Sequence, residues 1–302
     1  MADEREPDLF AGARQAPPRA LTRLTPYVRR LVAPNASPFT FNGTCTYIVG
    51  DGAVAVVDPG PADDPHLAAI LAATEGERIE TILVTHTHRD HSAGANALRE
   101  ETGARILGAA PFAPKGDGSE GLDASHDRTY APDIVLADGE RFHGVGFSVE
   151  AVATPGHCAN HLCFALIEEN ALFSGDHVMA WSTSVVAPPD GSMGAYMASL
   201  DKLRGREERT YWPGHGGPVT EPQRYLRALA VHRRQREAAI LAVLADGPQT
   251  IPDIVAKVYV GLDPSLARAA GMSTRAHLED LAERGRVSVE ATGAGEQRFR
   301  RA

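Results

Sequence analysis

This 302-residue chain contains little cysteine, no long apolar run and no internal repeat. Its three cysteines are too few to imply a disulfide framework. No apolar run approaches the roughly 18 residues that a membrane-spanning helix needs. Residues 1–25 have no apolar signal core and carry several acidic side chains, which argues against a signal or transit peptide. We therefore expect a flexible N-terminal tail at residues 1–25, no membrane association and a cytoplasmic location.

The overall composition is that of a globular enzyme. Hydrophobic residues make up 43% of the chain and charged residues 23%, which excludes the intrinsically disordered class. The formal net charge of −9 is unevenly distributed, because residues 223–302 hold 13 Lys and Arg against 9 Asp and Glu. This imbalance indicates either a small basic module joined to an acidic body or ordinary surface variation.

Between residues 42 and 222, β-rich runs alternate with helical patterns. A hairpin is predicted at Asn42–Gly60, a buried strand at Thr81–Thr85, and helices at Pro65–Ala73, Ser92–Glu101 and Ala195–Leu203. The stretch Ala109–Ala131 is rich in Gly, Pro, Asp and Ser and predicts an irregular loop. Further strands are predicted at Ile134–Leu136, Phe147–Ala153, Leu162–Ile167 and Ala171–Ser174. Such alternation is typical of a layered α/β architecture.

The pattern changes after Pro222. A long basic amphipathic helix is predicted at Arg224–Leu244, and shorter helical units follow at Ile251–Val260 and Ser265–Glu283. The chain ends with a predicted hairpin of Arg286–Glu290 and Gln297–Arg301. Three helices and a terminal hairpin are the order of a winged helix. We therefore predict three parts, a tail at 1–25, a catalytic domain at 26–222 and a winged-helix-like domain at 223–302.

The most informative segment follows the predicted buried strand directly. Within six positions it carries three imidazoles and one carboxylate, those of His86, His88, Asp90 and His91. These groups are the ligands that a divalent metal such as zinc prefers. Four ligand-type side chains are more than one ion can easily take from so short a segment. The crowding therefore suggests two ions side by side.

Three later turns each offer one more ligand-type side chain. His157, Asp176 and His215 all stand where an apolar strand meets a glycine-containing turn. Strand ends at one edge of a sheet converge in space, and glycine lets the backbone turn sharply there. Accidental clustering of solvated side chains is the competing interpretation, which becomes weaker with each matching turn. The combined pattern predicts a binuclear metal-dependent hydrolase.

In type and order, these seven residues resemble the ligand set of the metallo-β-lactamase-fold superfamily, over roughly residues 40–230. The resemblance implies a four-layer αβ/βα sandwich. It also implies that Asp58 braces the ligand loop through hydrogen bonds. The implied metal ligands are His86, His88 and His157 on the first ion, Asp90, His91 and His215 on the second, and Asp176 bridging both.

Several phrases are similar to the metallo-β-lactamase-like protein 2 group in particular. They are Thr85–Gly94, Glu168–Asp176, Ala195–Leu203 and Tyr211–Gly216. That group also has a small winged-helix region after its catalytic domain. Its characterised activity is metal-dependent cleavage of single-stranded RNA, so the resemblance implies RNA as the favoured candidate substrate. Thr87 departs from that group, which often carries a bulkier residue there.

The expected mechanism uses a hydroxide that bridges two ions. A bound metal lowers the pKa of its water from about 15.7 to about 7, so that a nucleophile exists at neutral pH. This hydroxide would attack a phosphoryl or carbonyl centre, and Asp90 would be the catalytic residue that orients it. Zn²⁺ is the expected metal, with Mn²⁺ or Fe as alternatives.

Other functions remain open at this point. Glyoxalase II, a thioester hydrolase, is more distantly similar and shares nearly the same ligand set. A nucleic-acid-binding regulator with a structural metal site is a third interpretation, because the C-terminal module carries basic residues that attract phosphates. Asp176 stands where some zinc β-lactamases use Cys, which disfavours β-lactam hydrolysis. The segment Trp181–Pro189 is either part of a substrate cleft or ordinary loop packing, and the oligomeric state is left undetermined. The remaining histidines are expected to be ordinary solvated or packed residues: His66, His126, His143, His161, His177, His232 and His277.

Overall fold

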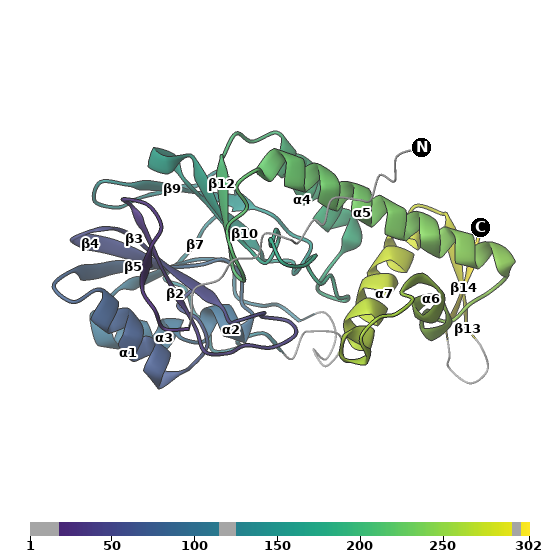
Figure 1. Ribbon diagram of the computed structural model, residues 1–302, viewed down its shortest axis with the longest axis horizontal. Coiled ribbons are helices and arrows are strands. Elements are labelled where there is room, and N and C mark those ends of the chain that lie inside the picture. The colour runs from purple at the N-terminus through teal and green to yellow at the C-terminus, as the bar shows by residue number, and fades with distance from the viewer. Residues whose placement is uncertain (1–17, 115–124, 292–296) are drawn as a thin grey trace.

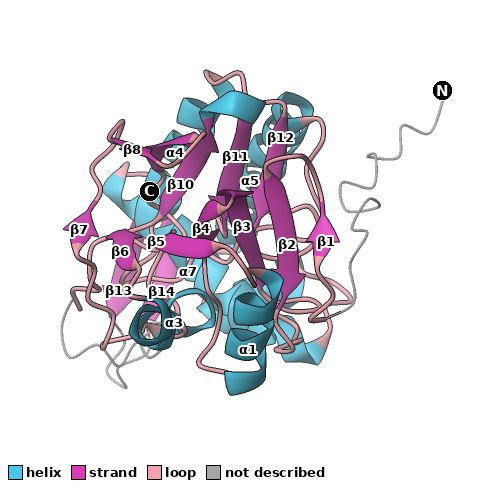
Figure 2. Ribbon diagram, turned by 90° about the vertical axis from the view of Figure 1, so that its left-hand side faces the viewer, coloured by secondary structure: helices cyan, strands magenta, loops and turns pink. Residues whose placement is uncertain are grey.

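In the computed structural model, two β-sheets pack face to face and helices cover their outer faces (Figures 1 and 2). The structure describes residues 18–114, 125–291 and 297–302. Most of the tail predicted at 1–25 and part of the predicted loop 109–131 lie outside these residues. Within the described ranges, no helix is long and apolar enough to cross a membrane.

The first sheet has seven strands in chain order. The hairpin of β3 and β4 is the one predicted at Asn42–Gly60, and β4 to β7 run parallel to one another. β1 and β2 join the sheet in antiparallel pairing on the other side of β3. The strands are β1 (Thr22–Arg23), β2 (Val28–Val32), β3 (Cys45–Asp51), β4 (Ala53–Val57), β5 (Arg78–Val84), β6 (Arg105–Gly108) and β7 (Ile134–Val135).

The second sheet has five strands in the order β12-β11-β10-β9-β8. β8 to β11 are antiparallel neighbours, whereas β12 pairs in parallel with β11. The short 3₁₀ helix η2 (Ile167–Glu169) forms the turn between β10 and β11. The strands are β8 (Arg141–His143), β9 (Ser148–Ala153), β10 (Leu162–Leu166), β11 (Ala171–Gly175) and β12 (Thr210–Pro213).

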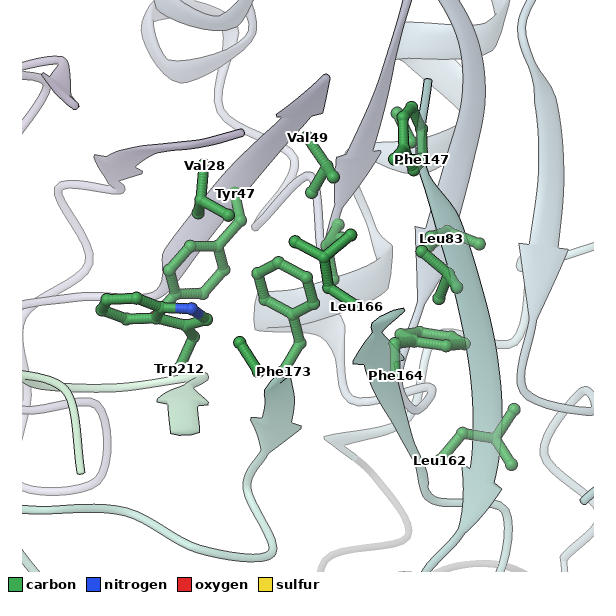
Figure 3. Close-up of a cluster of buried hydrophobic side chains, with 14 of the residues drawn as sticks. Val28, Tyr47, Val49, Leu83, Phe147, Leu162, Phe164, Leu166, Phe173 and Trp212 are labelled. Carbon is green, nitrogen blue, oxygen red and sulfur yellow. The ribbon is translucent and has the colours of Figure 1, made fainter. Parts of the chain in front are cut away.

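The main core lies between the two sheets. Tyr47 from the first sheet contacts Phe173 and Trp212 from the second, with ring centroids 5.1 and 6.4 Å apart (Figure 3). Burial of large apolar side chains from both inner faces stabilises the pairing of the sheets. We call the two sheets and the helices that cover them the sandwich.

Helices cover both outer faces, which gives the four layers expected for the fold. The first sheet is covered by α1 (Asp64–Ala73) and α3 (Ala95–Thr102), and the second by α4 (Met193–Arg204) and the first half of α5 (Pro222–Val243). The helix predicted at Ser92–Glu101 corresponds to α3, and the short helix α2 (Arg89–Ser92) precedes it. They are separated at Gly94, where a Cβ would lie 3.0 Å from the carbonyl oxygen of Pro59.

The C-terminal domain has its own small core. It comprises α6 (Ile251–Val258), α7 (Ala267–Glu283), β13 (Val287–Ala291) and β14 (Gln297–Arg301), with the 3₁₀ helices η3 (Leu244–Asp246) and η4 (Pro264–Leu266) (Figure 1). Leu278 and Phe299 meet Ile240 from the end of α5 in this core. The predicted order of helices and a terminal hairpin is confirmed.

α5 contributes to both cores. Leu226 and Leu229 pack on the second sheet of the sandwich, whereas Ile240 packs in the C-terminal domain. Figure 1 shows the helix extending from one part of the molecule to the other. The domain boundary placed at 222/223 therefore stays a prediction, since the helix that begins there belongs to both parts.

Candidate metal centre

The predicted ligands lie in turns after β5, β9, β11 and β12. His86 and His88 follow β5, and Asp90 and His91 are in the adjoining short helix α2. Asp176 is the first residue after β11. The turns after β9 and β12 supply the other two, His157 and His215. The structure brings all seven side chains to one edge of the sandwich, in three overlapping groups. Within each group the ligand atoms lie within 4.8 Å of one another, and the third group, His86, His91 and Asp176, links the other two.

The first group consists of His86, His88 and His157. The Nδ1 atom of His88 lies 3.0 Å from Nε2 of His86 and 3.0 Å from Nε2 of His157. All three side chains are buried. Burial disfavours the charged imidazolium and holds the pKa of each side chain below its usual value. These three rings are therefore neutral near pH 7, as metal-binding imidazoles must be.

The second group consists of Asp90, His91 and His215. The Nε2 atoms of the two histidines are 3.3 Å apart, and Oδ2 of Asp90 lies 3.5 Å from the first and 3.3 Å from the second. Burial opposes protonation, but the nearby carboxylates of Asp90 and Asp176 outweigh it and raise the pKa of both histidines, that of His215 to about 9. This group thus differs electrostatically from the first.

Asp176 lies between the two groups. Its Oδ1 is 3.4 Å from Nε2 of His91 and 3.4 Å from Nε2 of His215, and its Oδ2 is 3.7 Å from Nε2 of His157. Burial alone would raise the pKa of this carboxyl, but the two histidines lower it well below its usual value. An ionised carboxylate that faces both groups has the placement that a bridging ligand requires.

Asp58 holds the ligand loop from behind. Its carboxylate accepts hydrogen bonds from the backbone N–H and the hydroxyl of Thr85, both at 2.8 Å. It also accepts one from Nδ1 of His91 at 2.9 Å. The Thr85 hydroxyl in turn accepts from Nδ1 of His86 at 3.0 Å. These contacts are those that the predicted bracing role requires, since they leave Nε2 of both histidines directed at the cluster.

Backbone carbonyls hold two further histidines of the cluster. Nδ1 of His157 lies 2.6 Å from the carbonyl oxygen of Val185, and Nδ1 of His215 lies 3.3 Å from that of Gly43. Each ring therefore keeps its Nε2 directed at the cluster. Gly214 is required beside them, because a Cβ there would lie 2.6 Å from both Oδ1 of Asp176 and Cε1 of His91.

His161 is a functional candidate that sequence reasoning treats as an ordinary packed residue. It is indeed packed, but its Nε2 accepts the backbone N–H of Asp176 at 3.1 Å. Its Nδ1 donates to the hydroxyl of Thr154 at 2.8 Å. His161 thus positions the carboxylate between the two groups. Its place four residues after His157 is the signal that could have identified it.

The other histidines are packed or solvated, as predicted. His126 stacks on Phe112 and packs beside His88, with ring centroids 3.9 and 4.5 Å apart. His66 hydrogen-bonds to Thr46 at 2.9 Å, and His143 is exposed. For the segment Trp181–Pro189, the sequence leaves open a wall of the substrate cleft or ordinary loop packing. In the structure, Trp181 and Val185 of this segment line a cavity.

The donor set fits divalent metal ions. Nδ1 of His88 lies 3.0 Å from Nε2 of both His86 and His157 but has only one hydrogen or one lone pair to offer, whereas one cation would use the lone pairs of all three nitrogens. Oδ1 of Asp176 is buried and has no hydrogen-bond partner in the described part of the chain. Nitrogen and carboxylate ligands together suit zinc and also manganese or iron.

Comparisons with known proteins agree with this geometry. The family model described as the metallo-beta-lactamase superfamily matches residues 39–215, and that of a beta-lactamase associated winged helix domain matches residues 250–295. The fold is also that of a solved beta-lactamase domain protein from Burkholderia ambifaria, with a TM-score of 0.81 and 22% identity over 97% of this chain and 96% of that one.

Two curated proteins are informative relatives. A beta-lactamase-like protein 2 homolog from Drosophila melanogaster is 31% identical over 89% of this chain and 92% of its own length. An atrochrysone carboxyl ACP thioesterase from Aspergillus fumigatus is 34% identical over 73% of this chain and 66% of its own length. The first likeness extends over the C-terminal domain as well as the sandwich.

Proposed function

Because the chain belongs to the metallo-beta-lactamase superfamily of hydrolases, we propose that it is a binuclear enzyme that hydrolyses acyl thioesters. The observation that carries the binuclear assignment is the position of Asp176 between two groups of ligand-type side chains. The first ion would be held by His86, His88 and His157 and the second by Asp90, His91 and His215, with Asp176 shared. Zn²⁺ is the expected metal, with Mn²⁺ or Fe as alternatives.

When bound, two such ions supply a hydroxide nucleophile at neutral pH and stabilise the developing oxyanion. Asp90 is the ligand-type side chain most open to solvent, at 29% exposure against 10% for Asp176. We assign it the role of orienting the attacking water and holding its proton. The hydroxyl of Thr44 donates to Oδ2 of Asp90 at 3.4 Å and limits its rotation. In the reaction a C–O bond forms, the C–S bond breaks, and the products are a carboxylic acid and a thiol.

Two observations favour a thioester as the substrate. A relative that is similar over most of this chain bears the name of a thioesterase. The cavity beside the ligand loops is lined largely by apolar side chains, among them Met179, Trp181 and Val185. An apolar wall suits an acyl group better than a chain of phosphates. The net charge of −9 also disfavours a polyanionic substrate for the molecule as a whole.

Cleavage of RNA phosphodiesters is the second candidate. It is supported by the winged-helix domain and by the exposed Arg234, Arg300 and Arg301 in the C-terminal part of the chain. Basic side chains on such a domain would attract a nucleic acid strand. A regulator that binds nucleic acid and uses its metal only for stability would share these residues.

One assay separates these functions. Metal-reconstituted protein is given a benzoyl thioester, single-stranded RNA, a simple phosphodiester and a β-lactam in parallel, with and without chelator. We expect chelator-sensitive turnover of the thioester, with the other three much slower. Faster cleavage of RNA would overturn the thioester assignment, and salt-sensitive RNA binding without any turnover would favour the regulator. Metal analysis of the purified protein tests both the identity of the ions and their number.

A further inference from the structure

A cavity of about 140 Å³ lies between the loop that follows Asp176 and the C-terminal domain. One wall is formed by residues 179–185 of that loop, and the opposite wall by α5, α7 and the segment between α6 and α7. Phe39 closes a third side. The cavity is therefore assembled from both parts of the chain, and its C-terminal wall supplies none of the metal ligands.

Two wall residues connect the cavity to the ligand cluster. The carbonyl oxygen of Val185 holds Nδ1 of His157 at 2.6 Å. The ring of Trp181 packs against Gly216, the neighbour of His215, where a Cβ would lie 2.9 Å from Cδ1 of the indole. Trp181 also stacks on Phe41, with centroids 4.8 Å apart. The wall of the cavity thus contacts His157 of the first group and Gly216, the chain neighbour of His215 in the second.

The charged residue in the wall is Arg233 from α5. Its side chain is only 3% exposed, and its guanidinium lies 5.0 Å from the ring centroid of Tyr196 and donates to the carbonyl oxygen of Ser184. In the described part of the chain its Nε has no hydrogen-bond partner, and no carboxylate forms an ion pair with it. A guanidinium is always charged, and burying it without a counter-ion is costly. An anionic or carbonyl oxygen of a ligand would relieve this cost.

We propose that this cavity binds the acyl group of the substrate, a ring-sized apolar group with an oxygen substituent facing Arg233. This inference rests on the proposed thioester hydrolysis and specifies its substrate. The volume sets the size, because a cavity of about 150 Å³ in another protein accommodates benzene. The apolar lining selects a hydrocarbon ring, and the guanidinium selects a carboxylate or similar anion on it.

The size of the pocket is tested by filling it at Ala270, a buried wall residue on α7. In Ala270→Leu we expect the ratio of kcat/KM for a benzoyl thioester to that for an acetyl thioester to fall about tenfold or more. The matched control is Ala267→Leu, at an exposed position of the same helix, and its ratio should equal that of the wild type. If Ala270→Leu does not fold, Ala269→Leu fills the same cavity. An unchanged ratio in a folded variant would overturn the proposal.

The charge of the pocket is tested by binding rather than by turnover. Isothermal titration measures benzene-1,3-dicarboxylate and benzoate against the metal-loaded protein and its Ala270→Leu and Arg233→Gln variants. One carboxylate of each probe corresponds to the acyl carbon that faces the ligand cluster, and only the dicarboxylate carries a second one for Arg233. We expect the dicarboxylate to bind about tenfold more weakly to Arg233→Gln, with a much smaller change for benzoate, because the variant cannot form a charge-assisted hydrogen bond. Arg227→Gln, an exposed arginine on the same helix, is the control. Equal losses for both probes, or none, would overturn the role of Arg233.

The two levels of the proposal fail separately. If binding of the dicarboxylate depends on Ala270 and Arg233 but no thioester is hydrolysed, the pocket stands and the proposed reaction fails. If thioesters are hydrolysed but neither variant changes selectivity or binding, the reaction stands and the pocket fails. Metal analysis of Arg233→Gln is included because Arg233 contacts Ser184, next to the carbonyl that holds His157.

Discussion

In the sandwich, the buried rings of His91, His157 and His215 each use one nitrogen to contact a fixed acceptor, and the other nitrogen faces the cluster. In the C-terminal domain, the buried His277 has no hydrogen-bond partner on either nitrogen within the described residues. The difference separates two uses of one residue type. Imidazoles that are held from behind are positioned for metal chemistry, whereas His277 is an apolar filler that must stay neutral. The sandwich therefore carries the chemistry, and His277 gives the C-terminal domain a dependence on pH of its own, as the buried His177 does in the sandwich.

The largest effect should come from removing ligands on the sandwich side. The double substitution His86→Ala and His88→Ala should abolish metal binding and lower hydrolysis on the order of a thousandfold or more, because no nucleophile then forms at neutral pH. Metal content and turnover are measured on the same sample. His143→Ala, at an exposed histidine, is the control. Turnover in a metal-free double variant would refute the assignment.

Replacing Asp58, which holds the ligand loop through hydrogen bonds, should have a smaller effect. Asp58→Asn keeps the shape and tolerates the left-handed backbone at φ 49°, but its amide presents N–H groups where Thr85 and His91 need an acceptor. We expect metal affinity to fall about 10- to 100-fold. Competition with a chelator measures it, and Asp51→Asn, at the exposed end of β3, should leave it unchanged. Wild-type affinity in Asp58→Asn would show that the hydrogen bonds do not position His91.

In the C-terminal domain, the buried His277 should make the free energy of unfolding depend on pH. Burial, with further contributions from Arg233, Arg236, His232 and Arg284, lowers the pKa of His277 to about 3. In the unfolded chain His277 has its ordinary pKa of about 6.5 and binds a proton more readily than in the folded protein. The contribution of neutral His277 to the free energy of unfolding is therefore complete above pH 6.5 and is lost as the pH falls toward 3.

Between pH 7 and 4.5 this single group should reduce the free energy of unfolding by about 2.5 kcal/mol. In His277→Leu, which cannot be protonated, the loss measured by urea unfolding should be smaller by that amount. His143→Leu should retain the full dependence on pH. Parallel curves for the wild type and His277→Leu would mean that His277 is protonated in the folded protein.

The smallest effect concerns the basic surface of the C-terminal domain. Replacing Arg300 and Arg301, both exposed, by Gln should change thioester kcat/KM by less than about twofold, because neither lines the cavity. If RNA is a ligand of this domain, the same change should weaken its binding and make the salt dependence shallower by about one unit for each phosphate that is no longer neutralised. A large decrease in thioester activity would contradict the separation of the two regions.

Most of the sandwich could be predicted because its strands are apolar runs that end in glycine-containing turns. The ligand cluster could be predicted because ligand-type residues recur at those turns in a fixed order. β2 could not be predicted because Arg29 and Arg30 interrupt its apolar pattern. The cost of burying these two arginines is offset by residues from distant parts of the sequence. A carboxylate oxygen of Glu77 lies 2.6 Å from a guanidinium nitrogen of Arg29, and the carbonyl oxygen of Gly216 lies 3.3 Å from one of Arg30.

Contacts across long sequence distances set the other limits. The pairing of His161 with Asp176 and the cavity beside Arg233 both depend on how loops and domains meet, which no local pattern records. The split between α2 and α3 is hidden in the sequence because the helical pattern continues through Gly94. The metal identity and the cytoplasmic location stay predictions.

The shared helix α5 has a mechanical consequence. Since one rigid rod is anchored at Leu229 in the sandwich and at Ile240 in the C-terminal domain, the two ends cannot shift independently without bending it. A substitution that tilts the end of α5 near Ile240 would also move Arg233 and change the width of the cavity, while leaving the ligand turns in place. The substrate preference can therefore be altered by substitutions far from the metal ligands, through the orientation of α5 alone.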